Sequence, residues 1–198
     1  MSRFQHTRQP DWDWWSELWP DPTGLLDRVG VLPGELLVDV GCGNGYFTIP
    51  AAKLLEGPLY AVDLDESLLA QLRAELDERG IETVTCVRCD ARSLSDHIPP
   101  VDVAFMANTF HGVEDQTEFA TEIRRALNRE GRFIVVNWHD LPRSETVVAG
   151  KARGPPEALR LTPAETTTAV VPAGFELVST LDVPPYHYAL VFEREEKA

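Results

Sequence analysis

The sequence predicts a doubly wound α/β fold built on a seven-stranded sheet, with six parallel strands and one antiparallel strand. Three observations lead to this fold class: apolar runs alternate with helical patterns over residues 36–138, those runs are nearly unbroken, and only Pro184-Pro185 separates the last two. Strands that alternate with helices form parallel sheets covered on both faces, and such strands are apolar along their length. A two-residue connection joins antiparallel strands, so the last strand runs against the others.

The first thirty residues are predicted to form an N-terminal helical cap. Residues 1–10 have the composition of a loose tail, and residues 11–29 carry a helical pattern that Pro20-Asp21-Pro22 divides into two short helices. Large apolar residues share one helical stripe: Trp12, Trp15 and Trp19, with Trp14 and Leu18 beside them. This stripe is typical of a face packed on the domain. The alternative is an aromatic wall over the cofactor cleft, with Trp15 in the substrate pocket.

Residues 31–198 are predicted to form a single domain. Its expected strands are 36–40, 59–64, 83–88, 101–107, 132–138, 175–183 and 186–194, and its expected helices are 46–56, 67–79, 118–128 and 162–172. Asp65 or Ser67 is available to cap the second of these helices and Gly80 to close it, while Thr162-Pro163 begins the last. Residues 140–161 are rich in Pro, Gly, Arg and Glu, which predicts an irregular, lid-like insertion.

The composition is that of one ordinary globular domain. The 198 residues are 43% apolar and 25% charged, and a chain of this length forms one sizeable core. No apolar run approaches the roughly 18 residues that span a bilayer, and residues 1–6 lack an apolar signal core, so we expect a cytoplasmic protein with no membrane partner. The formal net charge of −14 argues against nucleic acid as a partner. The oligomeric state stays open.

A glycine-rich loop carries the strongest functional signal. The segment from Val38 to Tyr46 leaves a predicted strand and opens a predicted helix, and its glycines follow the pattern Gly41-x-Gly43-x-Gly45. Glycines at such a turn let a ligand lie against the backbone. Tyr46 stands where the dinucleotide fingerprint has its last glycine, and Asp39 before the loop repels a pyrophosphate but attracts an ammonium or sulfonium. The loop therefore favours S-adenosylmethionine over a dinucleotide; a purely structural glycine turn is the alternative.

Two more carboxylates follow strands of the same predicted sheet. Asp63 ends the strand 59–64, where a carboxylate can accept hydrogen bonds from ribose hydroxyls, and Asp65 beside it is a helix cap in the simpler interpretation. Asp90 follows the strand 83–88 and is placed to receive an adenine amino group. Because open α/β sheets bind ligands at the carboxyl ends of their strands, we expect these side chains to lie near one another.

These segments resemble the successive motifs of the class I (seven-stranded, Rossmann-like) S-adenosylmethionine-dependent methyltransferases over residues 30–138. The likeness is greatest to the small-molecule branch that includes quinone and sterol C-methyltransferases. It implies a methyltransferase that acts on a small-molecule acceptor and leaves the acceptor unnamed. The cofactor-binding residues that it implies are Asp39, Gly41, Cys42, Gly43 and Gly45 for the methionine part, Asp63 and Leu64 for the ribose, Asp90 and Ala91 for the adenine, and Asn108 beside the transferred methyl group.

Three histidines are placed near the same predicted edge of the sheet. His111 follows the strand 101–107, His139 follows the strand 132–138, and His187 lies at the beginning of the reversed strand. We predict His111 or His139 as a general base, if the acceptor must lose a proton. The alternatives are histidines that only shape the pocket and a three-histidine metal site, which no spacing specifies.

The acceptor side of the site has further candidates. Trp138, Tyr186 and His187, together with Trp15, are predicted to line the substrate pocket. In the insertion, Arg153 and Arg160 are available to an anionic acceptor, although exposed arginines are usually solvated.

Three rival functions remain. An arsenic methyltransferase would suit three cysteines, but Cys42 lies in the glycine loop, and Cys86 and Cys89 share one strand and are predicted to be buried and unreactive. A nicotinamide-dependent oxidoreductase conflicts with Asp39 and with the missing last glycine. A non-catalytic adaptor that binds the cofactor would have the same motifs.

Overall fold

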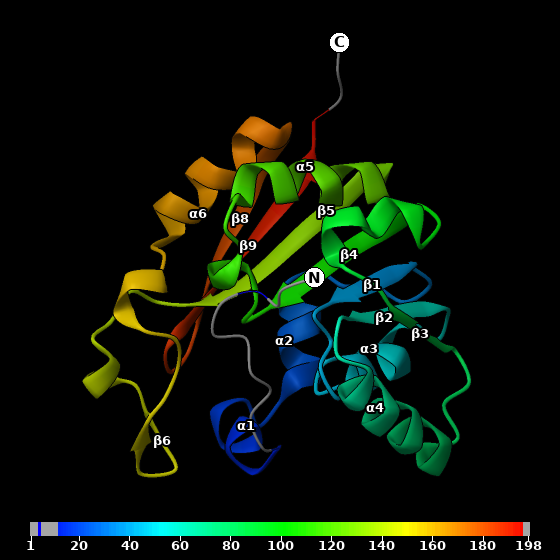
Figure 1. Cartoon of the computed structure of the whole chain (residues 1–198), viewed down its shortest axis with the longest axis horizontal. Coiled ribbons are helices and arrows are strands. Elements are labelled where there is room, and N and C mark those ends of the chain that lie inside the picture. The colour runs from blue at the N-terminus through cyan, green and yellow to red at the C-terminus, as the bar shows by residue number, and fades with distance from the viewer. Residues whose placement is uncertain (1–3, 5–11, 196–198) are drawn as a thin grey trace.

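A single seven-stranded sheet forms the centre of the molecule in the computed structural model, which describes Phe4 and residues 12–195 (Figure 1). The strands lie in the order β3-β2-β1-β4-β5-β9-β8. Their bounds are β1 Leu37–Val40, β2 Leu59–Asp63, β3 Val84–Arg88, β4 Val101–Ala107, β5 Leu127–Trp138, β8 Phe175–Val183 and β9 His187–Arg194.

Strand directions confirm the predicted fold class. Strands β1 to β5 pair in parallel, β9 is antiparallel to β5, and β8 is antiparallel to β9. Six strands therefore run one way and β9 alone runs against them. Strand β1 pairs with β2 on one side and with β4 on the other. The order of the strands across the sheet therefore reverses direction at β1. Ligands of open α/β folds bind outside the carboxyl ends of the strands at such a point.

Helices cover both faces of the sheet, and their ends follow the capping residues of the sequence (Figure 1). The helices are α2 Pro22–Arg28, α3 Thr48–Leu55 and α4 Glu66–Arg79 on one face, and α5 Gln116–Ala126 and α6 Pro163–Val170 on the other, where the 3₁₀ helix η1 Ala91–Asp96 also packs. The Asp65 carboxylate accepts a hydrogen bond from Ser67 N, so Asp65 is the cap of α4, and Gly80 ends that helix at φ 64°. Thr162 and Glu165 form a capping box at α6.

The N-terminal residues form two short helices, as Pro20-Asp21-Pro22 predicts. Helix α1 spans Trp12–Leu18, and the Asp21 side chain caps α2 through Gly24 N. In Figure 1, α1 lies at the bottom of the molecule, on the same side as β6. The predicted loose tail, residues 1–10, lies outside the described residues except for Phe4, whose ring packs edge-on against Phe119 at 5.5 Å.

The segment 140–161 has more order than its composition predicts. It contains a two-stranded hairpin, β6 Val147–Val148 with β7 Lys151–Ala152, between the 3₁₀ helices η3 Arg143–Glu145 and η4 Glu157–Leu159. Arg160 is only 6% exposed and donates to the backbone oxygens of Leu141, Arg153 and Pro155 and to Thr146 Oγ1. The expectation that Arg160 is solvated or free for an anionic acceptor is wrong, because its guanidinium holds this segment together.

Two apolar cores lie on the two faces of the sheet. In one core, the helices α1, α2, α3 and α4 pack on strand side chains such as Leu37 and Phe105. In the other, η1, α5 and α6 pack on strand side chains such as Phe133 and Phe192. In the described part of the chain, no helix is long and apolar enough to cross a membrane.

Candidate functional site

The glycine loop follows β1 directly and is shaped by its own packing. Helix α3 begins at Thr48, two residues later than predicted, so Tyr46 belongs to the loop. Gly41 has φ +74°, and a Cβ there would lie 2.8 Å from Thr109 Oγ1. Gly45 has φ +95°, and a Cβ there would collide with Leu72. The positive φ angles and these close contacts explain glycine at both positions without any ligand. We therefore infer a ligand only from the carboxylates around the loop.

Asp39 is a buried carboxylate beside the loop. It is 3% exposed, and its Oδ2 accepts a hydrogen bond of 2.6 Å from Thr48 Oγ1. Burial raises the pKa of Asp39 from 3.8 to about 7; the Thr48 hydrogen bond opposes this rise and the charge of Asp63 adds to it. No Lys or Arg of the described residues forms an ion pair with Asp39. A ligand ammonium would supply the positive charge that a buried carboxylate needs.

Asp63 fastens the loop to the end of β2. Its Oδ2 accepts from Gly43 N at 2.9 Å and its Oδ1 accepts from Asp65 N at 2.8 Å. These bonds hold the carboxylate at the carboxyl edge of the sheet, next to Leu64, while Asp65 is occupied as the cap of α4. Asp65 is therefore the helix cap, as predicted, and Asp63 is held at the edge of the sheet. A contact of Asp63 with ribose stays a prediction.

Asp90 is engaged by an arginine that the sequence analysis did not consider. Arg92 donates from Nε to Asp90 Oδ1 at 2.9 Å and from Nη2 to Oδ2 at 2.6 Å, and Arg92 N also donates to Oδ1. These bonds hold the pKa of Asp90 below its usual value. Oδ1 accepts two of the three bonds and Oδ2 one, so an adenine amino group would use the remaining lone pair of Oδ2. Ala91 beside it is buried.

Asn108 connects the end of β4 to the beginning of β9. Its backbone has φ +55°, a left-handed conformation that is uncommon outside glycine and is found at functional sites. Its Oδ1 accepts a hydrogen bond of 3.0 Å from His187 Nε2. Because an amide oxygen only accepts, this contact places the imidazole proton on Nε2 and leaves a lone pair on Nδ1. Burial lowers the pKa of His187 well below its usual value, so the ring is neutral.

The other two predicted histidines have different surroundings. His111 is 5% exposed, and its Nδ1 lies 3.4 Å from Asn137 Oδ1. The Nε2 of His139 lies 3.2 Å from Asp182 Oδ1 on β8. Both rings are near enough to His187 to contribute to the lowering of its pKa, which puts the three rings in one region. His187, however, is the ring that Asn108 joins to the end of β4.

Two tryptophan rings pack on His187 at a tilt: Trp138 at the end of β5 and Trp19 just after α1. The Trp138 ring centroid lies 4.1 Å from that of His187 and the Trp19 centroid 4.5 Å, and Trp15 stacks on Trp19 at 4.7 Å. Tyr186 stacks on Trp138 at 6.1 Å. The predicted substrate-pocket residues Trp15, Trp138, Tyr186 and His187 therefore form one cluster, which also includes Trp19. The side chain of Trp12 lies outside the described residues.

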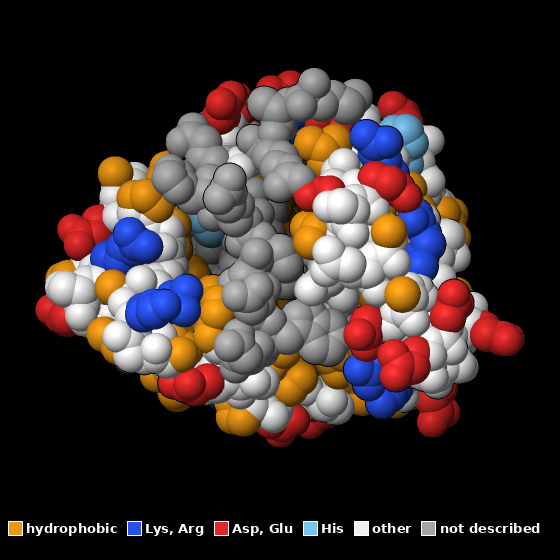
Figure 2. All heavy atoms as spheres, turned by 60° about the horizontal axis from the view of Figure 1, so that its bottom comes forward, with side chains coloured by type: hydrophobic (Ala, Val, Ile, Leu, Met, Phe, Trp, Pro, Cys, Tyr) orange, Lys and Arg blue, Asp and Glu red, His pale blue; other side chains and the backbone are white. Residues whose placement is uncertain are grey.

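Helix α1 is held over this cluster by contacts from both sides. Tyr46 of the glycine loop donates from its hydroxyl to Trp19 O at 2.6 Å. On the other side, Ala149 N of the β6–β7 hairpin donates to Glu17 at 2.8 Å, and the Arg153 guanidinium lies 4.9 Å from the Trp14 ring centroid. Figure 2 shows apolar and charged side chains interspersed on this face, with many of the acidic ones at its margin.

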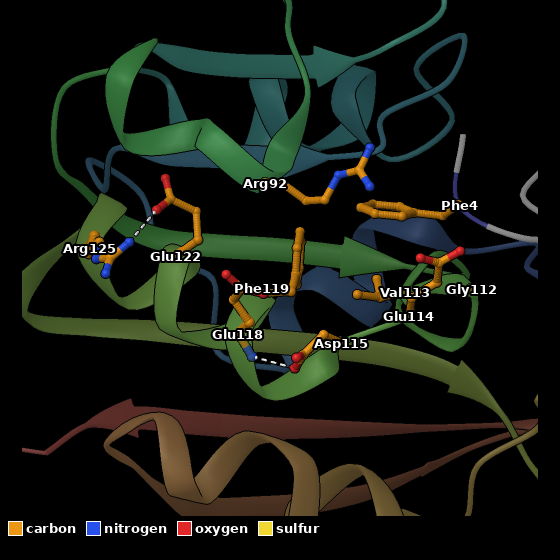
Figure 3. Close-up of a pocket in the computed structure, with 10 residues that line it drawn as sticks. All are labelled: Phe4, Arg92, Gly112, Val113, Glu114, Asp115, Glu118, Phe119, Glu122 and Arg125. Atoms are coloured by element: carbon orange, nitrogen blue, oxygen red, sulfur yellow. Dashed lines mark hydrogen bonds and ion pairs between the residues drawn. The ribbon is translucent and has the colours of Figure 1, made fainter. Parts of the chain in front are cut away.

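A hollow lies between η1 and α5, and no sequence pattern predicted it (Figure 3). It is a cavity of about 220 Å³ lined by Phe4, Arg92, Gly112, Val113, Glu114, Asp115, Glu118, Phe119, Glu122 and Arg125. Arg92 lies 5.7 Å from the Phe4 ring centroid and also holds Asp90, so this hollow adjoins the predicted adenine contact.

The cysteines are free thiols in poor surroundings for thiolate chemistry. Cys42 and Cys89 are buried and Cys86 is half-buried. Burial raises the pKa of Cys42 well above its usual value and that of Cys89 to about 11. The described residues contain no group of three or more His, Cys, Asp or Glu side chains able to hold a metal ion.

The sequence is similar to those of known methyltransferases. Residues 38–135 match a family described as "Methyltransferase domain". The chain is 29% identical over 127 residues to "Probable cobalt-precorrin-6B C(15)-methyltransferase (decarboxylating)" of Methanosarcina acetivorans, covering 62% of this chain and 64% of that protein. It is 32% identical over 111 residues to nocamycin O-methyltransferase of Saccharothrix syringae, covering 55% and 40%. Other relatives are named as methyltransferases of ribosomal protein L11 and of tRNA guanine. The chain spans less than two thirds of these curated relatives.

Solved structures agree in fold. A SAM-dependent methyltransferase from Aquifex aeolicus superimposes with a TM-score of 0.77 at 23% identity, over 90% of this chain and 91% of that chain. At this identity the likeness concerns the fold.

Proposed function

The chain belongs to the class I S-adenosylmethionine-dependent methyltransferases, and we propose that it transfers the methyl group of S-adenosylmethionine to a small-molecule acceptor. One observation carries the proposal: the buried carboxylate of Asp39 lies beside a glycine loop that Asp63 fixes at the carboxyl edge of the sheet. A dinucleotide would bring a pyrophosphate to the same place, where two carboxylates oppose it.

The residues present fit S-adenosylmethionine. In this proposal Asp39 and the loop of Gly41, Cys42, Gly43 and Gly45 hold the methionine part. Asp63 and Leu64 hold the ribose. Asp90 and Ala91 hold the adenine, with Arg92 keeping the Asp90 carboxylate ionised and oriented. Asn108 lies where the acceptor would meet the methyl group.

The bound cofactor supplies a methyl group on a positively charged sulfur, which is already a good leaving group. The protein then has to align the acceptor with that methyl group and exclude water. The strained Asn108 and the aromatic cluster of Trp15, Trp19, Trp138, Tyr186 and His187 are suited to both tasks, since α1 covers them with apolar rings.

A small molecule is the acceptor class that the charge of the chain favours. The formal net charge of −14 opposes binding of RNA, and relatives are named for acting on a precorrin and on nocamycin. Others are named for a ribosomal protein and for tRNA, so the choice rests on the charge and on the enclosed aromatic cluster. The likeness to quinone and sterol C-methyltransferases stays a prediction.

A thermal-shift comparison tests the cofactor. A ligand that binds only the folded state stabilises it by about 2.7 kcal/mol at a hundredfold excess over its Kd. We expect stabilisation by S-adenosylmethionine and S-adenosylhomocysteine, none by NADH, and loss of the effect in Asp63→Ala. Asp77→Ala, on the exposed side of α4, is the matched control and should respond like the wild type.

Two results would contradict the proposal. Stabilisation by NADH alone would indicate a nicotinamide-dependent oxidoreductase. Stabilisation by the sulfur nucleosides without turnover of any acceptor would favour a cofactor-binding adaptor.

A further inference from the structure

We propose that the acceptor is a planar hydroxylated aromatic compound with additional oxygen atoms, and that His187 removes the proton of the hydroxyl group that is methylated. This inference rests on the proposed function and names the substrate class of the same site. It is carried by the buried polar atoms of the aromatic cluster and by the contact between Asn108 and His187.

Hydrogen-bond donors outnumber acceptors in the cluster. Trp15 Nε1, Trp19 Nε1 and Asn108 Nδ2 are buried, and none of them has a hydrogen-bond partner in the part of the chain that the structure describes. Trp15 is 7% exposed and Trp19 is 4% exposed, so neither indole is free to turn into water. Buried donors without partners are costly and rare in folded proteins. A ligand with several acceptor oxygens would satisfy all three.

The same group of residues also contains a buried acceptor atom without a partner in the described chain. His187 Nδ1 is buried and lacks a partner among the described residues, while His187 Nε2 is held at 3.0 Å by Asn108 Oδ1. A base whose proton is fixed on one nitrogen by a neighbouring amide presents its lone pair in one direction. Asn108 therefore acts as a positioning residue. Burial lowers the pKa of His187, so the ring is neutral before an acceptor binds and its Nδ1 lone pair is available. The negative charge of a phenolate beside Nδ1 would then stabilise the protonated ring.

Ring geometry determines the shape of the ligand. Trp19 and Trp138 both pack on His187 at a tilt, and Trp15 stacks on Trp19. Flat apolar faces next to donor atoms match a planar aromatic ring that carries oxygen. His187 is 0% exposed, so such a ligand enters only if α1 and its Trp19 move away from the ring.

The proton and electron balance is simple. The acceptor O–H bond breaks, its proton goes to His187 Nδ1, and the oxygen keeps the electron pair. That oxygen forms a bond to the methyl carbon while the carbon–sulfur bond breaks with its pair staying on sulfur. The products are an aryl methyl ether and S-adenosylhomocysteine, and His187 returns the proton to water. No oxidant or metal is needed.

The test follows the ionisation of bound coloured phenols. The full chain, loaded with S-adenosylhomocysteine, is titrated with 4-nitrophenol and with alizarin at a pH where the free probes are mostly neutral. The absorption of both probes changes on ionisation. We expect the bound probes to be ionised, and we expect their methyl ethers, which cannot lose the proton, to bind at least tenfold more weakly.

Three variants locate the effect. In His187→Gln the bound probe should stay neutral and its affinity fall at least fivefold, while the affinity for S-adenosylhomocysteine stays within twofold of the wild type. Trp19→Phe keeps a ring but removes the donor, so it should weaken the probes and their ethers alike and leave the ionisation of the bound probes unchanged. His97→Gln changes an exposed histidine distant in the sequence from these elements and should behave like the wild type.

The outcomes separate the two proposals. Failure of S-adenosylhomocysteine to bind the wild type overturns the proposed function and this inference with it. Binding of S-adenosylhomocysteine with probes that bind neutral, or not at all, overturns this inference alone. Equal ionisation of the probes in the wild type and in His187→Gln removes His187 from the proton transfer.

Discussion

At the residue scale, the buried carboxylate of Asp39 affects stability and binding in opposite ways. Its pKa is about 7 in the folded protein, against 3.8 for an ordinary aspartate, mainly because of burial. Between these two pH values the folded protein keeps a proton that the unfolded chain has lost. The free energy of unfolding of the ligand-free protein therefore falls as pH rises from about 4 to about 7. A bound ammonium reverses this, because it pairs with the ionised form.

Replacing Asp39 by asparagine tests both effects with almost no change in shape. We expect Asp39→Asn to gain stability relative to the wild type as pH rises from 5 to 8 in denaturant titrations, since the variant has no buried charge. We also expect it to bind S-adenosylhomocysteine at least tenfold more weakly at pH 8 by calorimetry. A stability difference independent of pH would show that Asp39 is not protonated in the folded protein.

At the element scale, helix α1 is seven residues long and depends on tertiary contacts for its position. Trp19, the residue that follows the helix, packs on His187, while Tyr46 and the β6–β7 hairpin contact the helix from its two sides. The helix is therefore the element of the site that is most easily displaced without unfolding the sheet.

Tryptophan fluorescence tests this view of α1. The chain has five tryptophans, and four of them precede residue 20. Deleting residues 1–19 leaves Trp138 alone, and we expect its emission to shift to the red and to be quenched by acrylamide, with the circular dichroism of the sheet retained. The probes for the acceptor site should bind at least fivefold more weakly.

The matched control keeps the helix and removes only its indoles. It carries Trp12→Phe, Trp14→Phe, Trp15→Phe and Trp19→Phe, so Trp138 again reports alone but stays covered. Equal quenching of Trp138 in the truncated and the substituted chain would mean that α1 does not cover the site.

The same elements show which features the sequence can predict. Periodicity and capping residues give most strands and helices to within about two residues, as at α4, because those signals are local: Asp65 accepts from Ser67 N, and Gly80 takes φ 64°. The beginning of β5 is an exception, because the strand starts at Leu127, five residues before the predicted 132. The contact of Asn108 with His187 joins residues 79 apart, and the burial of Arg160 depends on carbonyl groups of a folded hairpin. No local pattern encodes such contacts, so the sequence predicts neither the pairing of Asn108 with His187 nor the burial of Arg160, while a base at His111 or His139 stays a prediction.

At the scale of the whole molecule, the excess of acidic residues separates the possible acceptors. The chain has 32 Asp and Glu against 18 Lys and Arg, and a protein that binds RNA gains affinity from the counterions its basic residues displace. Relatives named for tRNA methylation make this a real alternative.

A direct measurement with tRNA decides the point. We expect no change in the fluorescence anisotropy of labelled tRNA at micromolar protein and low salt, with or without S-adenosylhomocysteine. Binding that weakens as salt rises, and that heparin removes, would indicate a local basic surface and would contradict the small-molecule assignment.

The reversal of β9 has a practical consequence for work with this protein. Because β9 starts beside Trp138 and ends beside Arg132, Glu195 lies at the opposite edge of the sheet from the proposed site. A fluorescent fusion, an affinity tag or a surface linker joined after Glu195 would leave the reactive edge facing solution. The same attachments placed before α1 would change the position or mobility of the helix that covers His187. Binding measured with amino-terminally tagged protein would then include the effect of the tag.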